Sequence, residues 1–266
     1  DVPRGPVSHG SLVGRVIRSY CHAPIVGLTA EDLSGAADSR SYLRALRSIL
    51  AFARSHPGIR ILVNISLGTE EPEAAERTLI RRLNAEGAIV VAAAGNDNTT
   101  ERFYPAAYGE TLAVASADSH DKALHSNYGE WVDLAASGDI TFIDYEFLPY
   151  ERLRREMEAR GTSFAAPRVS AALAWILDRR PLATPEKAWE IARKTARPLP
   201  GEHYAAGHLG AGLLEMYELK SSLYPLYRWV HYGLPIALGL ALVAVTVFLC
   251  WRMRLAGVFI GLLIWL

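Results

Sequence analysis

Short apolar runs alternate with amphipathic stretches along most of this chain. The apolar runs occupy residues 23–30, 59–65, 88–93, 111–117 and 131–135, and the amphipathic stretches occupy residues 42–55, 72–86 and 184–195. Short, almost wholly apolar runs are typical of strands buried on both faces, and a 3.6-residue period is typical of helices with one buried face. Strands that alternate with helices form parallel sheets. The sequence therefore predicts an α/β fold of three layers with a mostly parallel sheet, in one domain over residues 1–217.

A second feature is an uncharged segment near the C-terminus. Residues 230–251 carry no formal charge, and at about 1.5 Å per residue they are long enough to cross a bilayer core of about 30 Å. We predict a transmembrane helix at 230–251, joined to the domain by a linker at 218–229; a buried helix of a soluble domain is the alternative. Residues 255–266 are also apolar but too few to span, which indicates an incomplete second transmembrane helix.

Two arginines, Arg252 and Arg254, follow the predicted span. Positive residues beside a span favour the cytoplasmic side, so we expect the domain on the outer side of the cell membrane. Arg228, on the other side of the span, weakens this orientation.

Composition excludes several classes of function. The formal net charge is +0 and the pI about 7.3, so no basic excess indicates a nucleic-acid partner. The 2 cysteines can form neither a disulfide framework nor a zinc site, and no glycine-rich phosphate loop is present. We therefore predict no cofactor.

Polar residues follow two of the predicted strands. Ser66-Leu67-Gly68 follows one, and Gly95-Asn96 follows the next. Because the carboxyl ends of parallel strands meet at one edge of a sheet, this edge is where ligands bind. Each stretch taken alone has an ordinary explanation as a turn.

A serine stands at the start of a predicted helix in the stretch 161–167. Ser163 precedes an apolar stripe of helical period, and Pro167 is placed where a missing N–H costs little, near the helix start. A helix N-terminus favours developing negative charge nearby. The alternative is an N-cap serine.

Together, these stretches resemble the subtilisin-like serine proteases, or subtilases, over about residues 9–216. The resemblance rests on motifs in the family's order: His9-Gly10, Ser66-Leu67-Gly68, Ala92-Ala93-Ala94-Gly95-Asn96, Tyr104-Pro105-Ala106 and Gly161-Thr162-Ser163-Phe164-Ala165-Ala166-Pro167. It implies a subtilisin-like fold, a serine endopeptidase activity and a protein or peptide substrate. Structural calcium is common in the family, but we identify no ligand set here.

The resemblance also implies roles for individual residues. Ser163 would be the nucleophile, His9 the general base and Asn96 the side-chain donor to the oxyanion. The walls of the pocket for the substrate side chain would be Ser66, Leu67, Gly68, Ala93, Ala94 and Gly95. Phe103 would shorten this pocket and favour small or medium side chains.

One part of the family pattern is missing from the chain as given. The family carries a catalytic aspartate at the end of a strand some tens of residues before the histidine, whereas only eight residues precede His9. Neither Asp1 nor Asp32 fits that motif. The sequence therefore predicts truncation at the N-terminus, loss of the first strand, and poor activity of this piece alone.

Three alternatives stay open. In the first, the chain is a catalytically inactive, membrane-tethered pseudoprotease that binds peptides. In the second, it is an esterase that uses Ser163 with Asp178 and either His203 or His208. The third is a sedolisin-type peptidase, which would lack His9 and carry an acid at the position of Asn96. The charged stretch 144–160 is predicted to be a solvated helix or loop.

Overall fold

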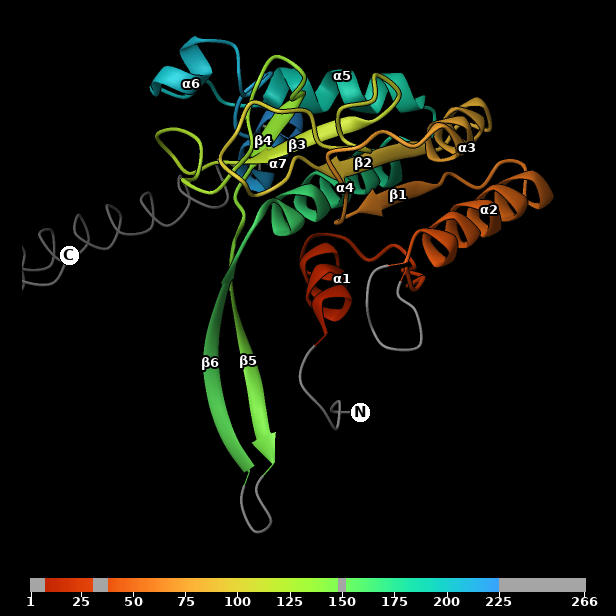
Figure 1. Ribbon diagram of the computed structural model, residues 1–266. Coiled ribbons are helices and arrows are strands. Elements are labelled where there is room, and N and C mark those ends of the chain that lie inside the picture. Colours follow the sequence, from red (N-terminus) through yellow and green to blue (C-terminus); the bar gives the residue numbers. More distant parts are fainter. Residues whose placement is uncertain (1–7, 31–37, 148–151, 225–266) are drawn as a thin grey trace, which may run out of the picture. The chain divides into compact units, whose positions relative to one another are not determined.

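The computed structural model describes residues 8–30, 38–147 and 152–224 (Figure 1). Four strands form a parallel sheet in the order β1-β2-β3-β4. Their bounds are β1 Leu62–Ile65, β2 Ile89–Ala93, β3 Leu112–Ser116 and β4 Leu134–Ala136. Val63 pairs with Val90, Ala92 with Ala113, and Ala115 with Ala135. The predicted parallel sheet is therefore confirmed.

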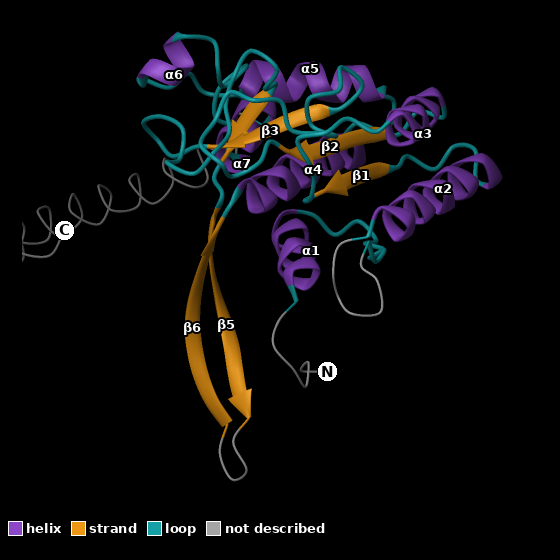
Figure 2. Cartoon of the chain, in the orientation of Figure 1, coloured by secondary structure: helices purple, strands orange, loops and turns teal. Residues whose placement is uncertain are grey.

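Helices cover the sheet on both faces. The described helices are α1 His9–Tyr20, α2 Ser39–Ser55, α3 Ala74–Ala85, α4 Thr162–Arg179, α5 Pro185–Thr195, α6 Glu202–Ala205 and α7 Met216–Leu223. Val90 and Ala92 of β2 join a core with α2 and α3. Alternate residues of a strand point to opposite faces, so the equally buried Val91 and Ala93 face α4, which contacts all four strands. Figure 2 shows these helices around the strands.

Local sequence signals set the ends of most helices. The side chain of Thr184 caps α5 by accepting the N–H of Lys187 at 3.2 Å, and Pro185 is the first helical residue. The carboxylate of Asp38 caps α2 in the same way through the N–H of Ser41 at 2.8 Å. The helix predicted at 72–86 begins only at Ala74, so Pro72 precedes the helix.

The strand predicted at 23–30 does not form. Residues 21–30 are irregular, and their apolar side chains are exposed: Ile25 by 39%, Val26 by 81% and Leu28 by 47%. A strand needs a hydrogen-bonding neighbour, and among the described residues β1, the edge strand, pairs only with β2. The apolar pattern was therefore insufficient to define a strand here.

The stretch 144–160, predicted as a solvated helix or loop, instead contributes the end of β5 and all of β6 to a β-hairpin. Strands β5 Asp139–Phe147 and β6 Arg152–Arg160 pair antiparallel and extend away from the sheet (Figure 1). Ile140 pairs with Ala159 and Phe142 with Met157, which gives the base of the hairpin one apolar face. Because charged residues interrupt this two-residue period in the sequence, the strand pattern was missed.

The predicted transmembrane helix at 230–251 and the predicted incomplete helix at 255–266 lie outside the described residues. Within residues 8–30, 38–147 and 152–224, no helix is long and apolar enough to cross a membrane. Contacts divide the chain into two units, Asp1–Leu219 and Lys220–Leu266.

Candidate active site

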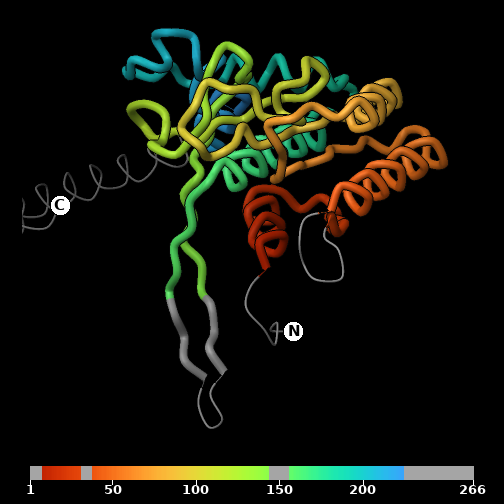
Figure 3. The backbone as a smooth tube through the Cα atoms, in the orientation of Figure 1, coloured from red at the N-terminus to blue at the C-terminus, as the bar shows by residue number. Residues whose placement is uncertain are grey.

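The ends of β1 and β2 bring the predicted site residues to the start of α4. Ser66 follows β1, and Gly95 and Asn96 come shortly after β2. The chain passes from β6 through Gly161 directly into α4, whose second residue is Ser163 (Figure 3). Contacts therefore join residues 66 and 163, and residues 96 and 162, that are far apart in sequence.

The side chain of Asn96 is fixed by Thr162, the residue before the serine. Its Oδ1 accepts the backbone N–H of Thr162 at 2.8 Å and the Thr162 hydroxyl at 3.1 Å. The same hydroxyl accepts the N–H of Gly95 at 3.1 Å, and Thr162 is fully buried. With its oxygen held in this way, the Asn96 amide nitrogen has no hydrogen-bond partner among the described residues and remains available as a donor.

The loop that carries Asn96 is shaped by Gly95 and Asn127. Gly95 has a φ of +102°, and a Cβ there would lie 2.3 Å from the Asn127 amide nitrogen. Only glycine adopts this backbone conformation readily and leaves room for the amide. Asn127 is buried and accepts the N–H of Asp97 at 2.8 Å through Oδ1. Its backbone N–H donates to the Gly95 carbonyl at 3.0 Å, so Asn127 stabilises the turn on both sides of Asn96.

Ser163 lies inside the first turn of α4 and is not its N-cap. The N-cap is Gly161, so the N-cap interpretation of Ser163 is wrong. The half-buried Ser163 hydroxyl donates to the carbonyl oxygen of Ser66 at 3.2 Å. The backbone N–H of Ser163 is in the first turn, where no intrahelical acceptor exists. The hydroxyl, this N–H and the Asn96 amide are thus brought into one neighbourhood.

The helix that begins with His9 packs against the start of α4. Leu12, Val13 and Val16 form a buried cluster with Phe164. The rings of His9 and Phe164 have centroids 5.4 Å apart at 53°. His9 is exposed and lies beside the residue that follows Ser163, but no hydrogen bond joins its ring to Ser163 among the described contacts. Catalytic hydrogen bonds are often formed only once substrate binds.

Phe103 lies between the two predicted pocket walls. A Cβ at Gly68 would lie 2.6 Å from Phe103 Cε1, and a Cβ at Gly95 would lie 3.0 Å from Phe103 Cγ. The N–H groups of Thr69 and Tyr104 donate to each other's carbonyl oxygens at 2.8 and 2.7 Å, which holds Phe103 near Gly68. The ring therefore contacts both walls.

The residues of the esterase alternative do not meet. Asp178 is near the far end of α4, about 20 Å along the helix from Ser163 at about 1.5 Å per residue. His203 instead pairs with Asp121, with 2.8 Å between Nδ1 and Oδ2. Burial opposes ionisation of Asp121, but hydrogen bonds from His203 hold the pKa of this carboxyl below its usual value. No triad of Ser163, Asp178 and His203 exists in this fold.

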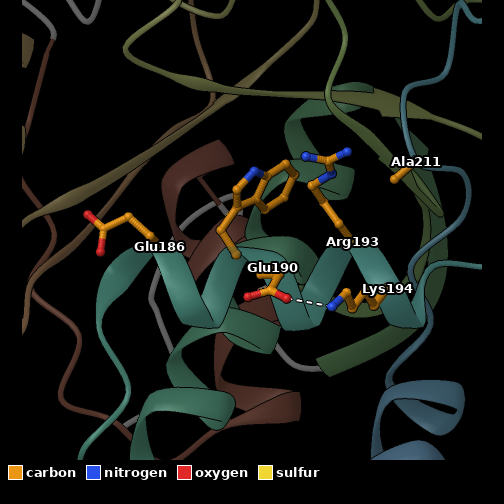
Figure 4. A pocket seen from close by; sticks show the side chains of 6 residues that line it. Glu186, Glu190, Arg193, Lys194 and Ala211 are labelled. Carbon is orange, nitrogen blue, oxygen red and sulfur yellow. Dashed lines mark hydrogen bonds and ion pairs between the residues drawn. The ribbon is translucent and has the colours of Figure 1, made fainter.

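None of the described residues forms a group of three or more His, Cys, Asp or Glu side chains that could hold a metal ion. A hollow of about 420 Å³ lies along α5. Figure 4 shows side chains that line it, among them the pair Glu190 and Lys194. Its lining residues are Glu186, Trp189, Glu190, Arg193, Lys194 and Ala211, none of them a predicted site residue.

Sequence reasoning missed three residues that support the site. Thr162 orients Asn96, Asn64 bonds to Ser66, and Arg168 connects α1 with α4 through Tyr20. Thr162 was quoted only as part of the serine motif. Asn64 carried a visible signal, because it is the one polar residue of an otherwise apolar strand.

Comparisons with known proteins show to which family the chain is similar. Residues 18–212 match the Subtilase family, which leaves His9 outside the match and includes Asn96 and Ser163. The chain is 31% identical over 160 residues to subtilisin BL of Lederbergia lenta, which covers 60% of this chain and 56% of that protein. It is 36% identical over 110 residues to thermitase of Thermoactinomyces vulgaris, 41% of this chain and 37% of that protein.

The fold has a counterpart among solved structures. The crystal structure of a lanthipeptide protease aligns with a TM-score of 0.64 at 19% identity, over 82% of this chain and 76% of that one. The chain spans about half the length of the curated relatives it matches, 56% of subtilisin BL. Since the family match covers well over half of the 266 residues, this chain belongs to the subtilase family.

Proposed function

We propose that this protein is a serine endopeptidase that cleaves peptide bonds through an acyl-enzyme. The observation that carries the proposal is the fixed Asn96 side chain, whose oxygen is held by Thr162 and whose amide lies beside the turn of Ser163. A hydrogen-bond donor held rigidly beside a serine at a helix start stabilises the oxyanion of acyl transfer.

In the proposed reaction, the Ser163 hydroxyl oxygen attacks the substrate carbonyl carbon while its proton passes to His9. The Asn96 amide and the Ser163 N–H stabilise the oxyanion. His9 then donates the proton to the leaving amine as the C–N bond breaks. Water, activated by His9, attacks the acyl-enzyme, and its proton returns through His9 to Ser163.

His9 needs a carboxylate to orient its ring, and none of the described carboxylates bonds to it. Loss of that partner costs about 10⁴ in kcat in serine protease triads. We therefore expect low activity of residues 1–266 alone, and an aspartate in upstream sequence remains our prediction.

The test is labelling with a fluorophosphonate probe, which reacts with activated serines. We expect slow labelling of the 266-residue chain that is abolished in Ser163→Ala and reduced about 10²–10³-fold in Asn96→Ala, the cost known from subtilisin. Labelling that survives Ser163→Ala would exclude this nucleophile. Absence of labelling in a chain that carries the predicted aspartate, together with retained peptide binding, would favour the pseudoprotease alternative.

We also propose that Phe103 limits the substrate side chain before the cleaved bond to small or medium size. The proposal is supported by the contacts that its ring makes with both predicted walls, at Gly68 and Gly95. Phe103→Gly is expected to shift cleavage of a peptide library toward large side chains, whereas Phe52→Ala, at an exposed aromatic of α2, leaves the profile unchanged. A wild-type profile dominated by Phe or Tyr and unchanged in Phe103→Gly would contradict it.

We further propose that residues 230–251 anchor the protein in the cell membrane with the domain outside. The support is the uncharged length of this segment. The full chain should resist carbonate extraction from membranes, and a chain ending at Tyr224 should be released. Release of both chains from the membrane would contradict the proposed anchor.

A further inference from the structure

Pro167 changes the hydrogen bonding of the helix that carries the nucleophile. Thr162 is the first residue of α4, so Pro167 is the sixth. The prediction that Pro167 lies near the helix start, where a missing N–H costs little, is therefore wrong. In an α-helix the N–H of residue 167 would donate to the carbonyl of residue 163. Proline has no N–H, so the Ser163 carbonyl loses its intrahelical partner.

The Ser66 hydroxyl replaces that partner. It donates to the carbonyl oxygen of Ser163 at 2.9 Å, while the Ser163 hydroxyl donates to the carbonyl oxygen of Ser66 at 3.2 Å. The two residues therefore hold each other in both directions. The turn of the nucleophile is tied to the end of β1 by side chains that the helix itself cannot supply.

The Ser66 hydroxyl is in turn held by Asn64. Asn64 Nδ2 donates to Ser66 Oγ at 3.0 Å, and Asn64 Oδ1 accepts the hydroxyl of Ser170 at 3.0 Å. Ser170 is buried and lies on the same helix as Ser163. The hydrogen bonds therefore form a chain with one direction. Ser170 donates to Asn64, Asn64 donates to Ser66, and Ser66 donates to the Ser163 carbonyl, so each hydroxyl proton makes one bond.

We infer that Asn64 is a positioning residue for the nucleophile, an inference that rests on the proposed function. Asn64 holds Ser66 with the proton of its hydroxyl directed at the Ser163 carbonyl, and so fixes the peptide plane that follows Ser163. This accounts for an amide in a strand whose other residues, Leu62, Val63 and Ile65, are apolar. A half-buried amide there is tolerated because both of its ends are bonded.

The test compares Asn64→Asp with the wild-type chain in the form that shows activity. The carboxylate has the shape of the amide but no proton to donate, so the Ser66 hydroxyl turns toward it and leaves the Ser163 carbonyl. We expect kcat to fall about tenfold, the scale of a small loss of positioning, with KM changed less than about twofold. Asn84→Asp, at a half-buried amide of α3 that bonds to the Glu110 carbonyl, should leave both constants unchanged.

A second pair of measurements separates positioning from folding and from activity itself. Ser66→Ala removes the same link without a buried charge and should lower kcat by a similar factor. The ¹³C resonance of the Ser163 carbonyl should shift in both Asn64→Asp and Ser66→Ala, whether or not the chain is active. Wild-type kcat in both variants, or an unshifted carbonyl resonance, would overturn the inference. An inactive wild type with a shifted resonance would overturn the proposed function alone.

Discussion

At the scale of single residues, the site depends on hydroxyl groups with two partners each. The Thr162 hydroxyl accepts from the Gly95 N–H and donates to Asn96 Oδ1, and it is fully buried. Such a group sets the direction of its neighbour's amide, because a buried hydroxyl satisfies both of its partners only in one orientation.

Thr162→Val is expected to lower both stability and activity. Valine keeps the shape but leaves the Gly95 N–H without a partner, which costs about 1–3 kcal/mol of unfolding free energy. The Asn96 amide loses one of its two restraints, so kcat should fall about tenfold, the scale of a small loss of positioning. Urea unfolding and steady-state kinetics measure the two effects. Thr78→Val, at an exposed threonine of α3, is the control, and equal losses in both variants would contradict the argument.

At the scale of elements, α1 is held in place by α4 through more than apolar packing. The Arg168 guanidinium donates to the Tyr20 hydroxyl and to the carbonyl of Asp139, both at 2.6 Å. One side chain of α4 therefore ties the C-terminal end of α1 to the base of the β5–β6 hairpin. The other end of α1 carries His9.

Tyr20→Phe should loosen α1 without unfolding the domain. Loss of a hydrogen bond from a charged donor costs about 1.5–3 kcal/mol. Amides of α1 are expected to exchange with solvent faster, while amides of α2 keep their rates. Ser19→Ala, which removes only a bond to the Val16 carbonyl within the same helix, is the control. Equal exchange in Tyr20→Phe and the wild type would show that packing alone holds α1.

At the scale of the whole molecule, one buried carboxyl links stability to pH. Glu76 of α3 is only 5% exposed, and burial raises the pKa of its carboxyl above the usual value. The nearby Tyr42 and Tyr108 hydroxyls oppose this pKa shift, and the nearby Glu73 adds to it. A carboxyl whose pKa is raised by folding favours the folded state most when it is protonated.

The unfolding free energy of Glu76→Gln is therefore expected to rise relative to that of the wild type as pH rises. Below the ordinary pKa of glutamate the two proteins should be similarly stable, because both side chains are neutral. As pH rises through the raised pKa of folded Glu76, the wild type loses stability relative to the variant. Urea unfolding from pH 4 to pH 9 measures this difference. A difference that stays constant or narrows with rising pH would contradict the burial argument.

The sequence predicted the elements whose pattern was regular. All four sheet strands lie within the predicted runs or extend one residue beyond them, and α5 lies within the predicted stretch 184–195. Where the pattern was incomplete, the prediction was wrong. Residues 23–30 have the composition of a strand, but no described strand pairs with them. In contrast, β6 pairs with β5 although its composition is strongly charged.

By itself, the sequence determined the layer order, the edge of the sheet at which chemistry would lie, and the family to which the serine motif belongs. Only the tertiary structure decided how the site is held. The bonds of Ser66 to Ser163, of Asn64 to Ser170 and of Asn96 to Thr162 join residues 97, 106 and 66 positions apart. Sequence periodicity reports which face of an element is buried, but side-chain hydrogen bonds depend on how separate elements are placed in space.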